Sequence, residues 1–206
     1  MLTVQQAENE MAEAEKLTPG LWAPHSRSAG VNARIIAEHC GLDGDKAYIF
    51  GLLHDIGRRD GSWDGRHIID GYNYMMSINQ PEIARICLTH TFPSQSEVSR
   101  YVVKMKITDE QKRFMCDYSD GIEYNDYDRL IQLCDAISLP SGAVIMEKRL
   151  MDVALRHGVG EYSVAKWKSF FALKALFDKK CGCNIYTFLP NIIENTLSDM
   201  PIDFRI

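Results

Sequence analysis

The sequence predicts an all-α protein, and two observations carry that prediction. Apolar residues recur at helical spacing along nearly the whole chain, and Pro, Gly or Asp clusters separate the resulting segments. No stretch of alternating apolar and polar residues is long enough to indicate a sheet. The chain has 206 residues, of which 46% are hydrophobic, and this is enough for one continuous core. We therefore expect a single helical domain over 1–206.

Ten segments have the pattern of a helix. The first, over 4–17, is polar and rich in Glu and Ala. The second, over 26–40, carries an apolar stripe and ends before Gly41. The third, over 45–56, is almost wholly apolar and ends before Gly57. The others are expected over 68–77, 81–90, 109–118, 127–139, 143–157, 164–180 and 185–197.

The segment over 164–180 is unusually aromatic, with Trp167, Phe170, Phe171 and Phe177. A helix that covers the core explains this composition, and a contact between two copies in a homodimer is the alternative. Both interpretations stay open on the sequence alone.

The net charge of −5 limits the choice of partners. A surface that neutralises many phosphates of a long nucleic acid is expected to be basic, so we predict no such partner. Local basic groups could still bind a small anionic substrate. The sequence shows no signal region and no apolar run of roughly 18 residues, so we expect a cytoplasmic protein without a membrane partner.

His54 and Asp55 are adjacent and directly follow an apolar run that ends at Leu53. A helix C-terminus carries partial negative charge and favours a cation. A buried carboxylate is costly without a partner, and a metal explains the neighbouring imidazole as well. A hydrogen-bonded core pair is the alternative.

Asp135 lies within a second apolar segment, where its carboxylate also needs a buried partner. The partner is either a metal or an arginine. His25 follows Pro24 at the expected start of a helix, and by itself would be interpreted as a capping or surface histidine. His39 and His157 each come shortly before a glycine, where histidine commonly stabilises a helix C-terminus.

In order and context, His25, the pair His54-Asp55 and Asp135 resemble the H…HD…D signature of the HD superfamily of metal-dependent phosphohydrolases. The resemblance spans 25–138. It implies an HD-domain helical bundle over about 20–140, with an extra N-terminal helix and a C-terminal helical extension over about 141–206. It also implies that the four matched side chains hold a catalytic metal.

His67 and His90 extend the resemblance to HD members with two metals, which have two further histidines between the HD pair and the last Asp. The resemblance then implies that these histidines complete the second metal site. Asp55 would bridge the two ions.

Ligands of this kind, without thiolate, suit iron, manganese, cobalt, nickel or zinc, and the sequence does not choose among them or between one ion and two. The resemblance implies hydrolysis of a nucleotide or another small phosphorylated metabolite by a phosphomonoesterase or phosphodiesterase, with water activated at the metal. Asp55 or Asp135 would accept a proton from that water.

The phosphate of such a substrate needs further cations. Arg58 and Arg59 follow the HD pair, while Arg27 and Arg66 are close to proposed ligands. The planar guanidinium suits phosphate, so we expect one or two of these four to bind substrate, with surface salt bridges as the alternative.

Two other functions fit the same residues. Some HD-fold proteins with this ligand pattern use a di-iron centre to activate oxygen and cleave a carbon bond. Others are non-catalytic modules for binding or regulation, but these tend to have lost ligands, and this chain has all the expected ligand types.

Overall fold

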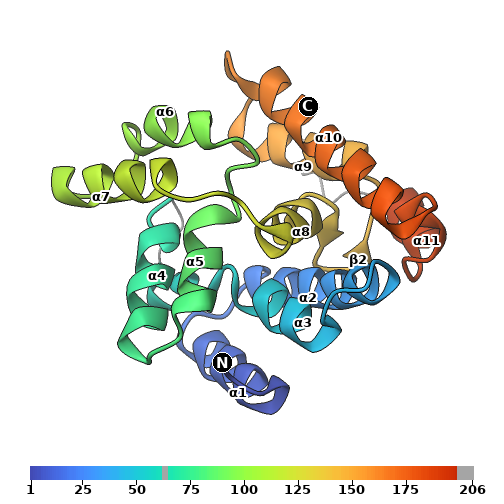
Figure 1. The fold of residues 1–206 in the computed structure, drawn as a ribbon, viewed down its shortest axis with the longest axis horizontal. Coiled ribbons are helices and arrows are strands. Elements are labelled where there is room, and N and C mark those ends of the chain that lie inside the picture. The colour runs from blue at the N-terminus through green and yellow to red at the C-terminus, as the bar shows by residue number, and fades with distance from the viewer. Residues whose placement is uncertain (62–64, 199–206) are drawn as a thin grey trace, which may run out of the picture.

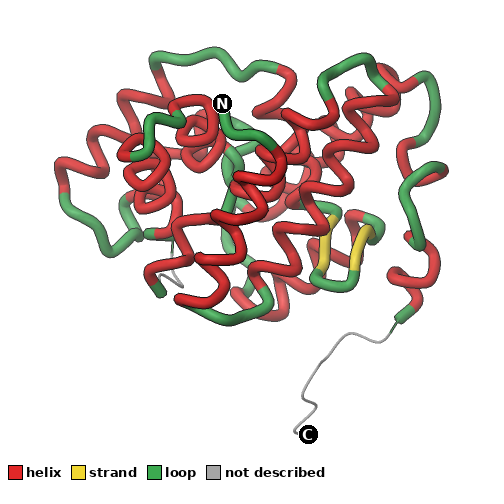
Figure 2. The backbone as a smooth tube through the Cα atoms, turned by 90° about the horizontal axis from the view of Figure 1, so that it is seen from below, coloured by secondary structure: helices red, strands yellow, loops and turns green. Residues whose placement is uncertain are grey.

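The computed structural model describes residues 1–61 and 65–198, and helices dominate this part of the chain (Figures 1 and 2). The described β structure is one antiparallel hairpin of two short strands. The prediction of an all-α fold is therefore confirmed. The helices are α1 (Val4–Leu17), α2 (Trp22–His39), α3 (Gly44–Leu53), α4 (His67–Ser77), α5 (Pro81–Thr89), α6 (Val98–Val102), α7 (Asp109–Asp120), α8 (Asp126–Asp135), α9 (Met146–His157), α10 (Ser163–Cys181) and α11 (Ile192–Leu197). The 3-10 helices are η1 (Ile56–Asp60), η2 (Gln95–Glu97) and η3 (Ile185–Thr187), and the strands are β1 (Ser138–Leu139) and β2 (Gly142–Ala143).

Helices α2 and α3 cross closely because each has a glycine at the contact. A Cβ built on Gly51 would lie 2.7 Å from the Cα of Gly30, so there is no room for a side chain there. This crossing sets the first turn of α2 beside the C-terminal end of α3 (Figure 1). The distance between His25 and His54 depends on it.

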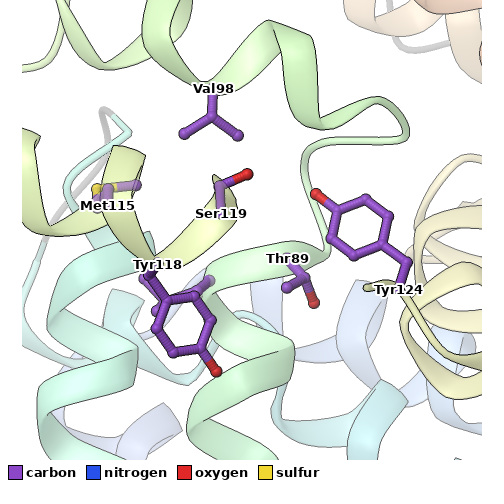
Figure 3. Close-up of a pocket in the computed structure, with 7 residues that line it drawn as sticks. Thr89, Val98, Met115, Tyr118, Ser119 and Tyr124 are labelled. Carbon is purple, nitrogen blue, oxygen red and sulfur yellow. The ribbon is translucent and has the colours of Figure 1, made fainter. Parts of the chain in front are cut away.

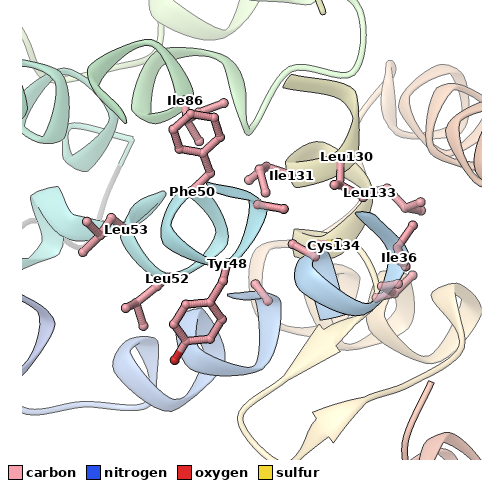
Figure 4. Packing of buried hydrophobic residues seen from close by; sticks show 14 of the residues in the cluster. Ile36, Tyr48, Phe50, Leu52, Leu53, Ile86, Leu130, Ile131, Leu133 and Cys134 are labelled. Carbon is pink, nitrogen blue, oxygen red and sulfur yellow. The ribbon is translucent and has the colours of Figure 1, made fainter. Parts of the chain in front are cut away.

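The core surrounds α3, which is buried from Ala47 to Leu53. Figure 4 shows Phe50 of this helix beside Ile86 of α5 and near Ile131 of α8, and all three belong to one apolar cluster. Burial of one large apolar side chain contributes about 1.5–3 kcal/mol, so this helix is held firmly from all sides. A rigid α3 gives a fixed position to the residues that follow it.

Helix α8 is joined to α5 by a buried ion pair. The carboxylate of Asp128 is fully buried, and it accepts hydrogen bonds from Arg85 Nε at 3.0 Å and Nη2 at 2.6 Å and from Thr89 Oγ1 at 2.8 Å. One turn later, Gln132 Nε2 donates to the carbonyls of Thr89 at 3.0 Å and Phe92 at 2.9 Å. These bonds set the ends of α5 and α8 side by side.

Several predicted helix bounds were wrong. The third helix ends at Leu53, and the chain continues as η1. The helices predicted to end at Leu139 and to start at Ala143 instead flank the β hairpin, whose second strand begins at Gly142 with φ 128°. The helix predicted over 185–197 is divided into η3 and α11, with Pro190 between them, and α6 was not predicted. Turns of this kind depend on tertiary contacts that local periodicity does not encode.

Most of the aromatic segment packs inward. Phe170, Leu173 and Phe177 of α10 are buried in the core, whereas Phe171 is 39% exposed. One apolar cluster includes residues of both α1 and α11, and a second joins α4, α5, α6 and α7. The single-domain organisation stays a prediction. The homodimer contact stays a prediction. Within the described residues, no helix is both long and apolar enough to pass through a bilayer.

Candidate metal centre

Six predicted ligands come from five elements. His25 lies in the first turn of α2 and His67 begins α4, whereas His54, His90 and Asp135 lie at the C-terminal ends of α3, α5 and α8. Asp55 follows His54. Three helices thus direct the partial negative charge of their C-termini toward the ligands, and this charge favours a cation.

Two groups of possible ligand atoms form around one carboxylate. In the first group, one possible ligand atom from each residue lies within 4.8 Å of the other two, and the residues are His25, His54 and Asp55. The second group meets the same condition and consists of Asp55, His67 and His90. Asp55 belongs to both. This arrangement supports its predicted role as a bridge between two ions.

Within the first group, backbone carbonyls orient the imidazoles. His25 Nδ1 is 3.1 Å from the carbonyl of Ser138, and His54 Nδ1 is 2.7 Å from that of Gly51. A carbonyl can only accept, so Nδ1 carries the proton in both rings. In His54 this leaves Nε2 with a lone pair, whereas Nε2 of His25 faces a carboxylate. Asp135 stands at the edge of this group, with Oδ1 3.0 Å from His25 Nε2.

In the second group, Asp55 faces the two other histidines. Its Oδ1 is 3.1 Å from His67 Nε2 and 3.6 Å from His90 Nε2. His90 Nδ1 is 2.9 Å from the carbonyl of Cys87, so this ring too turns Nε2 toward the carboxylate. Close packing against α4 produces the contact with His67, because a Cβ built on Gly57 of η1 would lie 2.1 Å from the carbonyl oxygen of His67.

The donor set fits a metal. Among the described residues, the buried atoms His54 Nε2 and Asp55 Oδ1 have no partner in hydrogen-bond geometry, although His67 Nε2 lies 3.1 Å from Asp55 Oδ1. Buried polar atoms without partners are costly, and both atoms are of the types that bind transition metals. The site could therefore hold one or two divalent ions through His25, His54, Asp55, His67 and His90, with Asp135 beside His25.

Protonation also suits metal binding. Burial lowers the pKa of His54 to about 4, so its imidazole is neutral at physiological pH. Burial by itself would raise the pKa of Asp55, but the charge of Arg58 and the neighbouring imidazoles hold it well below its usual value. Burial by itself would also raise the pKa of Asp135. The contacts with His25 and Arg149 outweigh this effect, so the pKa of Asp135 is lowered. All three groups are in the form that binds a cation.

Of the four predicted substrate arginines, Arg58 lies in the cluster. Its Nε donates to Asp55 Oδ2 at 2.6 Å, and its Nη2 is 3.4 Å from His67 Nε2. Its side chain is 21% exposed, so one part remains open to solvent. This arginine can therefore contact both a metal ligand and a molecule bound beside it.

The other three arginines form ion pairs with acidic side chains outside the six proposed ligands. Arg27 pairs with Glu8 and Glu15 of α1. Arg59 lies 3.7 Å from Glu10 and stacks on the ring of Tyr74 at 3.7 Å. Arg66 lies 3.1 Å from Asp70. These contacts correspond to the salt-bridge alternative, and a substrate role for the three stays a prediction.

Sequence reasoning missed Arg149, which supports Asp135, and Ser138, which supports His25. Arg149 of α9 has Nη2 3.6 Å from Asp135 Oδ1, and its Nε donates to the Asp135 carbonyl at 3.3 Å. Ser138, whose carbonyl faces His25, is held by Asn32 Nδ2, which donates to its Oγ at 2.9 Å. Neither residue belongs to a recognisable motif, and no spacing in the sequence indicated them.

Two cavities lie apart from the ligands. The cavity in Figure 3 has a volume of about 10 Å³ and is lined by Thr89, Val98, Tyr118, Tyr124 and their neighbours, so it has room for about one water molecule. A second hollow of about 330 Å³ lies between α2, the β hairpin and α11. None of the six ligands lines either one, so neither explains how a substrate reaches the cluster.

The fold and the ligand set define an all-helical protein with a histidine–aspartate site that could hold metal. The family model for the HD domain matches residues 22–139, which is more than half of the chain. The chain therefore belongs to the HD domain family, as its resemblance implied. No match to this chain was found among curated proteins or among solved structures.

Proposed function

We propose that this protein is a metal-dependent phosphohydrolase that acts on a nucleotide or another small phosphorylated metabolite, as a phosphomonoesterase or phosphodiesterase. The observation that carries the proposal is the sharing of Asp55 between two buried ligand groups, with Arg58 at the same carboxylate. Membership of the HD domain family supports metal-dependent hydrolysis as the class of reaction.

The charges around the ligands favour an anionic substrate. Without metal, the carboxylates of Asp55 and Asp135 are balanced by the guanidinium groups of Arg58 and Arg149. Bound divalent ions would supply an activated water and would neutralise charge on phosphoryl oxygens. Each ion also adds positive charge to a set of side chains that is already neutral, and a phosphate can compensate for it.

The residues of the cluster have separable roles in this proposal. Arg58 orients Asp55 and offers its remaining N–H groups to a phosphoryl oxygen. The side chain of Asp135 is 24% exposed, against 6% for Asp55, so Asp135 is the carboxylate that reaches solvent. We assign the proton-accepting role to Asp135 for this reason. Arg149 positions Asp135 through two contacts.

The rival function is oxygen activation by a di-iron centre, which uses similar ligands. Elemental analysis of protein purified without chelator, followed by a panel of phosphoesters under nitrogen, separates the two. Phosphate release without oxygen supports our proposal. Two irons together with oxygen consumption on an organic substrate, and no phosphate release, would support the oxygenase instead.

A non-catalytic module is tested with matched variants. Asp55→Asn keeps the shape of the side chain but removes the charge shared by both groups, so metal content and phosphate release should both be lost. Asp45→Asn is the control, because Asp45 is exposed and its ion pair is with Arg34. A parent protein that is loaded with metal yet inert against the whole panel would favour a binding or regulatory role.

A further inference from the structure

Lys166 is a cation on α10, and the carboxylate of Asp135 influences its pKa. Helix α10 packs against α8, the helix that ends at Asp135 (Figure 1). Burial lowers the pKa of Lys166, and the charges of Glu97 and Asp135 oppose this shift. The ammonium group is therefore within electrostatic reach of a proposed metal ligand, although it belongs to the C-terminal extension.

Among the described residues, Lys166 forms no close ion pair, and the carboxylates of Glu97 and Asp135 act on it only from a longer distance. No carboxylate oxygen of the described residues lies within 4 Å of its Nζ, whereas Arg58, Arg149 and Lys174 each have such a contact. The side chain is nevertheless partly buried. Lysine loses hydration and side-chain entropy when it is buried, so a partly buried lysine whose nearest carboxylates lie beyond 4 Å is costly unless it binds an anion in the functional state.

Aromatic rings hold this lysine on the side of the cluster where Arg58 and His67 lie. Its Nζ is 5.9 Å from the ring centre of Tyr101 and 5.8 Å from that of Phe170. Tyr101 packs edge-on against Phe92 at 5.3 Å. A Cβ built on Gly65, two residues before His67, would be 3.0 Å from the Tyr101 hydroxyl.

Tyr101 also connects Lys166 to Arg58. Burial would lower the pKa of Arg58, but Asp55, Asp135 and Tyr101 raise it, so the tyrosine is near this guanidinium as well. Lys166 therefore extends the row of cations that begins at Arg58. An anion bound at the cluster would lie among these groups.

We propose that Lys166 binds a phosphate group of the substrate, so that the C-terminal extension forms part of the active site. This inference rests on the proposed phosphohydrolase function. The extension lies outside the match to the HD domain, which ends at residue 139, so the substrate contact from α10 belongs to this chain's own addition to the family core.

The test measures anion binding directly. Metal-loaded parent protein and the variants Lys166→Met and Lys168→Met are titrated with inorganic phosphate and, separately, with methylenediphosphonate, which has two phosphorus groups and resists hydrolysis. Lys168 is on the same helix and is exposed, so its variant controls for lost charge in general. Metal content and thermal unfolding are recorded for each variant.

We expect Lys166→Met to weaken binding about tenfold to a hundredfold, as is typical for the loss of a charged hydrogen bond, with unchanged metal content. Weaker binding of inorganic phosphate places Lys166 at the phosphate held by the metals, and weaker binding of the diphosphonate alone places it at a neighbouring phosphate. Lys168→Met should bind like the parent, and Lys166→Arg should recover most of the loss.

The inference and the proposed function fail in different ways. If the parent releases phosphate from esters but Lys166→Met has the parent's affinity for both anions and the parent's KM, the inference is wrong and the function stands. If phosphate binding depends on Lys166 but no phosphoester is hydrolysed, the proposed function is wrong and the anion site stands.

Discussion

Gly57 lies where η1 touches the first turn of α4, and Gly57→Ala tests whether this contact builds the second ligand group. The added Cβ would be 2.1 Å from the His67 carbonyl oxygen and 2.4 Å from the Gly71 nitrogen. Both are backbone atoms, so no side chain can rotate away. Ordinary contact requires roughly 1 Å more, and the two segments must therefore separate by about that distance.

A displacement of about 1 Å is large for a metal site, where ligand distances are held within about 0.2 Å. The Asp55–His67 contact of 3.1 Å crosses the displaced boundary, whereas His25, His54 and Asp135 do not depend on it. We expect loss of the ion held by Asp55, His67 and His90, with retention of the other. Overpacking should also lower the free energy of unfolding by about 1–3 kcal/mol.

The assay is elemental analysis of desalted protein, combined with urea unfolding. Gly160→Ala is the matched control, because a Cβ at Gly160 would have no heavy atom within 4 Å among the described residues. If Gly57→Ala retained the parent's metal stoichiometry, affinity and stability, the role assigned to this contact would be refuted.

Three further predictions follow from buried groups. Asp128→Ala should lower the free energy of unfolding by about 3–5 kcal/mol in urea titrations, because it leaves Arg85 without its partner. The control is Asp109→Ala, which removes a surface ion pair with Lys112 and should lower this free energy by less than about 1 kcal/mol. His54→Ala should lose metal in elemental analysis, and His39→Ala, which removes a ring stacked on Phe188, should keep it. In metal-free protein, the free energy of unfolding should rise between about pH 4 and about pH 6.5, because His54 binds a proton in the unfolded chain but stays neutral when folded. The slope of this free energy against pH should be at most about 1.4 kcal/mol per pH unit, and it should be smaller in His54→Gln. A pH-independent parent in this window would contradict the last of these.

The sequence determined the helical fold and the residue types of the candidate metal site. Periodicity along the chain is a local property, so α1 was predicted with its observed bounds and α10 to within one residue at each end. His54 and Asp55 were recognisable because an apolar helix leads directly to them, and buried polar groups need partners. The order of His25, the HD pair and Asp135 indicated the family that the HD domain match confirms.

Only the tertiary structure decided which charges meet. Arg58 and Arg59 are neighbours in sequence, yet η1 turns one toward Asp55 and the other toward Glu10 and Tyr74. Arg149 reaches Asp135 from a helix that carries no motif. His25 and Asp135 are 110 residues apart and meet at 3.0 Å. Such contacts depend on how helices pack, and packing is set by the whole core at once, whereas periodicity is set by a few neighbouring residues.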